Sequence, residues 1–146
     1  MSQHTYILFS VAGTTYAVRS HDVLHVEIPE NVTSVPNAAA AVEGVVFSRG
    51  HVVPVVNLRV RFGFERVPIA RATRLLVVQI RDRRVALMVD AAREFLTIPD
   101  AAVQPPGEAI TGLSGHYLDG VATIGDRIVL ILRIADLIAA VPHVAA

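Results

Sequence analysis

His21 and His25 are the side chains in this sequence whose spacing most directly suggests metal chemistry. On a helix, residues four positions apart share a face, and two imidazoles placed that way can bind zinc. The surrounding residues, His-Asp-Val-Leu-His-Val, are instead typical of a turn that leads into a strand. Four strand residues would separate the rings by about 13 Å. We therefore predict no metal site and interpret both histidines as surface or packed side chains.

The segment 112–116, Gly-Leu-Ser-Gly-His, resembles a nucleophile elbow in which Ser114 would attack and His116 would act as base. It lacks the second glycine at the required position and the strand-to-helix setting. A flexible loop is the better interpretation. The sequence also has no paired carboxylates, phosphate-binding glycine loop or kinase motif, so we do not expect an enzyme.

Composition limits the remaining classes of function. The 146 residues fit a single domain, and hydrophobic residues make up 53% of them, enough for a sizeable core. Thirteen acidic residues balance thirteen basic ones, so no net positive charge is available to hold nucleic acid. Cysteine is absent, which excludes disulfides and thiol chemistry. With no signal peptide pattern and no apolar run of about 20 residues, we expect a soluble cytoplasmic protein. Because cysteine is absent, His21 and His25 are too far apart and no phosphate-binding loop is present, we also expect no cofactor.

The stretch from Gly44 to Gly63 carries the clearest structural signal. It contains two apolar β-type runs that meet at Arg49-Gly50, with Pro54 inside the second run. Gly50 provides the positive φ of a tight hairpin, and Arg49 is left at the bend in contact with water. Pro54 cannot donate a ladder hydrogen bond, which predicts an edge or bulged strand. The pattern indicates a recognition surface.

Alternation and turn signals recur along the whole chain at intervals that suit an antiparallel β protein. The terminal segment 134–140 has helical spacing, and 38–42 is expected to form one helical turn. Together these elements predict an all-β fold of two small barrels built from interleaved strands and a short C-terminal helix. The expected strands are 6–11, 15–18, 23–28, 44–47, 51–56, 74–80, 85–89, 94–98, 117–124 and 127–132.

With these elements in place, the chain resembles the CheW family of chemotaxis coupling proteins from about residue 6 to residue 138. The resemblance implies two intertwined SH3-like barrels and an adaptor, without catalytic residues or cofactor, that joins transmembrane chemoreceptors to the histidine kinase CheA. It rests on the order and spacing of Gly44-Val45, Arg49-Gly50, 54–59 (Pro-Val-Val-Asn-Leu-Arg), Phe62-Gly63, Val89-Asp90, 117–121 (Tyr-Leu-Asp-Gly-Val) and Gly125-Asp126-Arg127.

The resemblance implies a receptor-binding surface that includes Arg49, Gly50, Val23 and Val26. An amphipathic receptor hairpin would lay apolar side chains between the two barrels, while Arg49 pairs with a carboxylate or with helix-terminal carbonyls at the cytoplasmic tip of the receptor. For Arg49 the alternative is a solvated turn residue, and for the two valines it is a place in the core.

The resemblance also implies contact with a domain of the same fold in the kinase, through an apolar patch. The matching segments place Val45, Val56, Leu58, Ala109 and Ile110 in this kinase-binding set. The alternative for the residues between 45 and 58 is that they are buried.

A few positions depart from the family pattern. Phe47-Ser48 replaces a pair that is usually polar and then apolar, Asn57 stands where aspartate is usual, and Arg133 stands where the last strand usually runs into aspartate. In the loop near 109, alanine replaces a larger apolar group.

The adaptor is thus the leading hypothesis, located in the cytoplasm at receptor arrays without insertion into the membrane. A barrel-based small-molecule sensor is the second, since a groove between barrels could serve as a pocket. A hydrolase that uses Ser114 and His116 is the weakest. Saturable binding of a receptor tip, binding of metabolites, or turnover that is lost in Ser114→Ala would distinguish the three.

Overall fold

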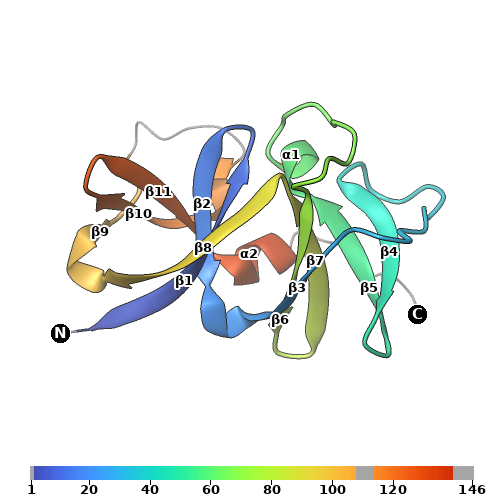
Figure 1. The fold of residues 1–146 in the computed structure, drawn as a ribbon, viewed down its shortest axis with the longest axis horizontal. Coiled ribbons are helices and arrows are strands. Elements are labelled where there is room, and N and C mark those ends of the chain that lie inside the picture. The colour runs from blue at the N-terminus through green and yellow to red at the C-terminus, as the bar shows by residue number, and fades with distance from the viewer. Residues whose placement is uncertain (1, 108–113, 140–146) are drawn as a thin grey trace.

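The structure is a computed structural model that describes residues 2–107 and 114–139 of the chain. It contains two β-sheets that lie side by side, and helix α2 (Ile134–Ala139) packs where they meet (Figure 1). We call the six-stranded sheet barrel 1. In spatial order it contains β8 (Ala91–Pro99), β1 (Gln3–Val11), β2 (Thr14–Arg19), β11 (Arg127–Leu132), β10 (Leu118–Ile124) and β9 (Val103–Gln104).

The five-stranded sheet, barrel 2, is formed by the middle of the chain. Its spatial order is β3 (Val23–Glu27), β6 (Arg74–Ile80), β7 (Arg83–Val89), β5 (His51–Asn57) and β4 (Val42–Ser48). The chain therefore starts in barrel 1, passes through barrel 2 and returns. Short helices lie between the strands: η1 (Ser20–Asp22), α1 (Leu58–Arg61), η2 (Asp100–Ala102) and η3 (Ser114–Tyr117).

The two barrels repeat one pairing pattern. In barrel 1 the pairs β8–β1, β1–β2 and β10–β11 are antiparallel, and β2–β11 is parallel. In barrel 2 the pairs β3–β6, β6–β7 and β4–β5 are antiparallel, and β5–β7 is parallel. The predicted all-β fold of two barrels is confirmed, and each hairpin expected from turn residues is present.

Pro54 does not mark an edge strand, which corrects the prediction. Strand β5 lies between β7 and β4, and the irregularity of this hairpin lies in β4, between Val42 and Gly44. Pro54 is opposite Val45, whose backbone N–H and C=O both bond to Thr33, so they point away from β5. The missing N–H of Pro54 therefore costs no hydrogen bond to β4.

The terminal helix is confirmed, and it buries Ile134, Leu137 and Ile138 as its spacing predicts. The helical turn expected over 38–42 is wrong. Two reverse turns occupy this region instead, closed by backbone bonds from Ala38 to Val35 and from Val42 to Ala39. Sequence reasoning also missed α1, which is capped by the side chain of Asn57 through a 3.4 Å bond from the Val60 N–H.

The largest apolar cluster fills the space between the barrels. It combines Phe9 and Tyr16 from barrel 1 with Leu76 and Leu87 from barrel 2, together with the buried face of α2. Two smaller clusters fill the interiors of barrel 1 and barrel 2. Because the core is continuous across both sheets, the barrels are joined rigidly through buried side chains.

A polar clamp reinforces this junction at the β1–β2 turn. Asp90, which follows β7, accepts a 2.8 Å hydrogen bond from the Ala12 N–H and a 2.9 Å bond from Arg59 Nε. Arg59 Nη2 lies 2.8 Å from the same carboxylate, and these bonds raise the pKa of Arg59. Arg59 and Asp90, both in segments that resemble the family, thus have a structural role between the barrels.

Candidate partner-binding surface

The turn between β4 and β5 presents Arg49 to solvent. Both turn residues have positive φ, 47° at Arg49 and 86° at Gly50, as a type I′ turn requires. Gly50 takes this conformation at no steric cost, whereas Arg49 does so at about 1 kcal/mol. Within the described part of the chain, no hydrogen bond or ion pair engages the Arg49 side chain. An exposed guanidinium on a fixed turn is suited to pairing with a carboxylate or a carbonyl group of another molecule.

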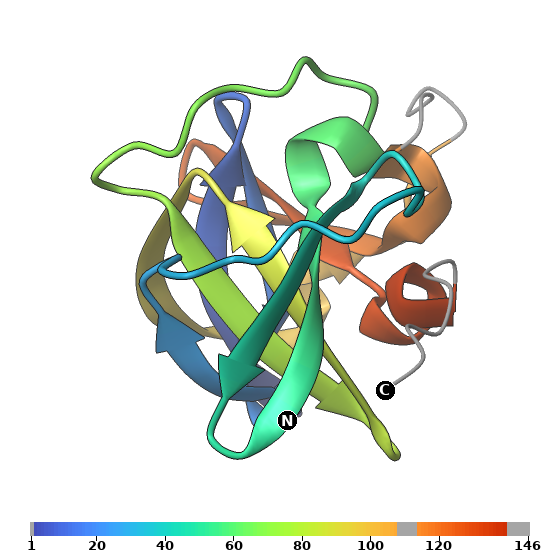
Figure 2. The same ribbon diagram turned by 90° about the vertical axis from the view of Figure 1, so that its right-hand side faces the viewer.

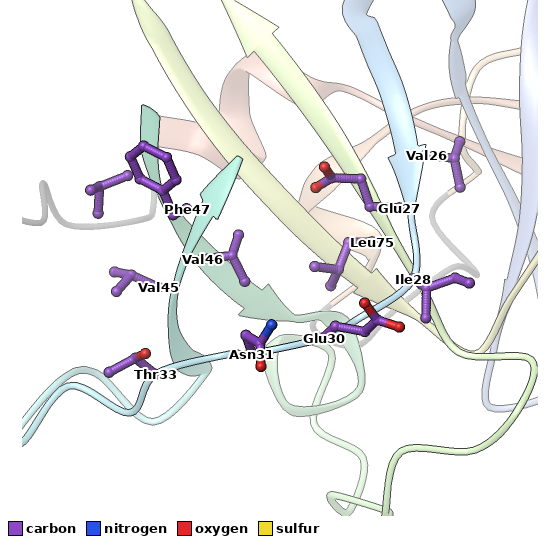
Figure 3. Close-up of a pocket in the computed structure, with 11 residues that line it drawn as sticks. Val26, Glu27, Ile28, Glu30, Asn31, Thr33, Val45, Val46, Phe47 and Leu75 are labelled. Carbon is purple, nitrogen blue, oxygen red and sulfur yellow. The ribbon is translucent and has the colours of Figure 1, made fainter. Parts of the chain in front are cut away.

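A groove with a volume of about 940 Å³ lies in barrel 2 between β3 and β4. Figure 3 shows Val26 and Glu27 on one wall, Val45 and Phe47 on the other, and Leu75 between them. The segment that connects the two strands crosses one end of the groove. It is held by paired backbone bonds of 2.9 and 2.8 Å between Thr33 and Val45. The lining combines apolar side chains with four polar residues: Glu27, Glu30, Asn31 and Thr33.

Exposed apolar side chains extend this surface onto the β4–β5 hairpin. Phe47 is 77% exposed, and its cross-strand partner Val52 is 55% exposed. Ile28, at the start of the connecting segment, is also exposed. Sequence reasoning did not select these three residues. The hairpin register places Phe47 and Val52 opposite each other and could have indicated a shared face.

Three of the four expected receptor-binding residues are exposed. Arg49 and Gly50 form the turn, and Val26 lines the groove at 41% exposure. Val23 is half-buried and packs against the core between the barrels, which favours the core alternative for this residue. The space between the barrels, where the bound helix was expected, is filled by that core. The groove lies along β3 and β4 instead.

The expected kinase-binding residues divide into three groups. Val45 lines the groove, so it shares a surface with Val26. Val56 and Leu58 are 0% exposed in the core between the barrels. For these two residues the structure favours the alternative that they are buried. Ala109 and Ile110 lie outside the described residues.

The two histidines that suggested metal chemistry have different neighbours. His21 lies in the turn η1 with its Nε2 atom 3.1 Å from Asp22 Oδ1, whereas His25 lies on β3 and contacts Ser48 and Glu27. Among the described residues, no group of three or more His, Asp or Glu side chains is arranged to hold a metal ion.

The side chain of Ser114 is outside the described part of the structure. None of the described helices is long and apolar enough to cross a membrane.

Arg133, another departure from the family pattern, links the last hairpin to α2. Its guanidinium lies 3.0 Å from Asp136 and 3.1 Å from Asp119, and these hydrogen bonds raise the pKa of Arg133. All three side chains are exposed, so the contribution to stability is small.

Residues 5–141 match the family described as CheW-like domain. The chain is 26% identical over 133 residues to the chemotaxis protein CheW of Klebsiella aerogenes, covering 91% of this chain and 80% of that protein. It is 29% identical over 133 residues to chemotaxis protein CheW of Helicobacter pylori, with the same coverage. The crystal structure of the scaffolding protein TtCheW from Thermoanaerobacter tengcongensis superposes with a TM-score of 0.83 at 27% identity, covering 90% of this chain and 89% of that one.

Proposed function

Because the chain belongs to the CheW-like domain family, we propose that it is a chemotaxis adaptor that joins the cytoplasmic tips of chemoreceptors to a CheA-type histidine kinase. The observation that carries this proposal is the exposed Arg49 on its type I′ turn, beside an apolar groove. A fixed charge next to an apolar surface is what a protein partner can recognise, and residues 1–146 would act as a single domain.

The adaptor would perform no chemistry. It would hold receptor and kinase in fixed geometry, so that ligand-driven states of the receptor change kinase activity through a coupling free energy of about 1–3 kcal/mol. The continuous core between the barrels supports this role, since a rigid body can transmit a change in position from one partner to the other. Such a role needs neither metal nor cofactor, and its setting would be the cytoplasmic receptor array at the inner membrane.

For the receptor, we propose a surface made of Arg49, Gly50 and Val26. An amphipathic helix of the receptor tip would place apolar side chains against Val26, on the β3 wall of the groove, while Arg49 pairs with a carboxylate or with the last carbonyls of that helix. Val45, on the opposite wall, would remain available to the kinase. Val23 supports β3 from the core side.

For the kinase, we propose that Val45 and the segment around Ala109 and Ile110 contact a domain of the same two-barrel fold. Val56 and Leu58 would contribute only indirectly, because both are fully buried in the core between the barrels.

A small-molecule sensor is less well supported. Ligand pockets enclose most of the ligand's surface, whereas this groove is bordered by the exposed side chains of Ile28, Phe47 and Val52. A metabolite placed there would remain largely in contact with water.

The direct test is reconstitution of purified protein with a receptor-tip fragment and the CheA kinase. We expect saturable binding to each partner and receptor-dependent kinase activity only when the adaptor is present. Val45→Glu should weaken kinase binding while the circular dichroism spectrum stays unchanged. Failure of the folded wild-type protein to bind either partner would refute the proposed function.

A further inference from the structure

The edge strands β3 and β4 of barrel 2 face each other across a seam, and these two strands do not pair with each other. Three side chains meet across it instead. His25 Nε2 lies 3.0 Å from Ser48 Oγ, Ser48 Oγ donates a 2.9 Å bond to Glu27 Oε1, and His25 Nε2 lies 3.3 Å from the same carboxylate oxygen. We call His25, Ser48 and Glu27 the seam cluster.

The hydrogen-bond directions in the seam cluster are mutually consistent. A serine hydroxyl has a single hydrogen, and Ser48 gives it to Glu27. Ser48 must therefore accept from His25, which places a proton on His25 Nε2. Ser48 is 3% exposed and the His25 side chain 9%, so the bonds between them are shielded from water. A shielded polar group left without its partner is costly, which makes the three side chains interdependent.

This arrangement does not suit catalysis. In a serine hydrolase, the histidine contacts the serine and the carboxylate through different ring nitrogens. Here the same nitrogen, Nε2, faces both. Ser48 is also too deeply buried to reach a substrate. The cluster is better explained by what it holds in place.

Ser48 is the last residue of β4, and Arg49 follows it directly. Because side chains alternate along a strand, an inward Ser48 turns Phe47 outward, where it is 77% exposed. This is the reverse of the polar-then-apolar order that is usual in the family at these two positions. The inward serine is tied to β3 on both sides of Val26, since His25 and Glu27 flank that residue.

We propose that the seam cluster positions the Arg49-Gly50 turn relative to Val26, so that His25 and Ser48, through their contacts with the groove-lining Glu27, determine partner affinity without contacting the partner themselves. The inference rests on the proposed receptor-binding function. The cluster links the hairpin that carries Arg49 to the strand that carries Val26, and both must face the partner at once. Loss of these bonds would leave Arg49 and Val26 present but no longer fixed in position relative to each other.

The test compares His25→Ala, Ser48→Ala and the double variant with the wild-type protein, each titrated with a labelled receptor-tip fragment well below the melting temperature. Each single variant should bind about three- to tenfold more weakly, which is the factor that one shielded hydrogen bond contributes to an equilibrium constant. The double variant should lose little more, because the two side chains act as one unit.

His25→Gln provides the rescue, because its amide can donate from a position close to that of the histidine Nε2. Gln79→Ala is the matched control. It removes a 2.8 Å side-chain bond to Arg84 in the β6–β7 hairpin of the same barrel, away from Arg49, and should leave affinity unchanged. Amide hydrogen exchange should rise at residues 47–52 in His25→Ala and stay unchanged at residues 75–77.

The outcomes separate the two claims. Normal affinity in His25→Ala and Ser48→Ala, in a preparation where Arg49→Glu binds at least tenfold more weakly, would overturn the positioning role and leave the proposed function intact. An equal loss of affinity in Gln79→Ala would also overturn the positioning role, because general destabilisation of barrel 2 would then explain the weaker binding. A wild-type protein that does not bind the receptor tip would overturn the proposed function, and the positioning role with it.

Discussion

The two barrels share one pairing pattern but close in different ways. In barrel 1 the edge strands β8 and β9 are joined by η2, a single turn over Asp100–Ala102. In barrel 2 the edge strands β3 and β4 are joined by residues 28–41, which follow an irregular path across one side of the sheet (Figure 2). The short connection brings the edges of barrel 1 together, whereas the long one leaves a groove in barrel 2.

The difference between the barrels lies in the connection of their edge strands more than in the sheets themselves. In barrel 1 the apolar cluster of the interior is buried; it includes Tyr6, Leu8 and Ile98. In barrel 2, Val46 and Leu75 belong to the interior cluster and also line the groove. The same architecture therefore gives a barrel with a covered interior on one side and a barrel with a groove on the other. The proposed recognition surface lies at this groove, beside a loop, where binding residues are common.

The largest effect is expected where the two barrels share their core. Leu58→Glu places a charge in a fully buried position and should unfold the protein, lowering the free energy of unfolding by about 4 kcal/mol or more. Leu24→Glu, at an exposed position on β3, is the control and should change the melting temperature little. A folded Leu58→Glu protein with normal stability would contradict the shared core.

A smaller effect tests the long connection of barrel 2. Gly44 has a φ of 149°, and a Cβ at this position would overlap the carbonyl oxygen of Thr33. Gly44→Ala should force the connecting segment away from β4 and cost about 3 kcal/mol, measured by urea denaturation. Gly13 in barrel 1 also has positive φ, but a Cβ added there would have no atom within 4 Å. Gly13→Ala should therefore cost only about 1 kcal/mol. Equal losses would show that the backbone contact at Thr33 is unimportant.

The clamp between the barrels should have a still smaller effect. Asp90→Asn keeps the shape of the side chain but removes the charge that Arg59 and the Ala12 N–H bind, and should cost about 1–3 kcal/mol in thermal unfolding. Asp126→Asn, in the exposed turn between β10 and β11, is the comparison and should be neutral. If both variants melt at the same temperature, the clamp does not hold the barrels together.

Much of the fold could be predicted from local signals. Turn residues such as Ala12-Gly13 and Gly125-Asp126 mark hairpins because only certain residues accept their backbone angles, and 134–138 has helical spacing. The errors have a physical basis too. Pro54 suggested an edge because its missing N–H was assumed to face the neighbouring strand, whereas the sheet places that position away from β4. Helix α1 is a single turn, too short for periodicity to show, although Asn57 was an available cap signal.

The candidate site was only partly predictable. The exposure of Arg49 could be predicted because a charged turn depends on local sequence. Val26 was selected through the resemblance, and its sequence did not decide between the surface and the core. Val56 could not be assigned, because β5 is covered on both faces and a continuous apolar run looks the same whether it is core or patch. Leu58 could not be assigned because it lies in α1, the single helical turn that was not predicted. The seam cluster depends on β3 and β4 meeting in space, which no local pattern reveals.

The most direct measurement of the central claim compares two arginines of barrel 2. Arg49 and Arg81 both occupy hairpin turns with positive φ, 47° and 57°, and both are exposed, but only Arg49 adjoins β4 and the groove. Isothermal titration of Arg49→Glu and Arg81→Glu with a receptor-tip fragment should show at least a tenfold loss of affinity, about 1.4 kcal/mol, for Arg49→Glu, and wild-type affinity for Arg81→Glu. Equal affinities in the two folded variants would contradict the assignment of partner recognition to this side of barrel 2.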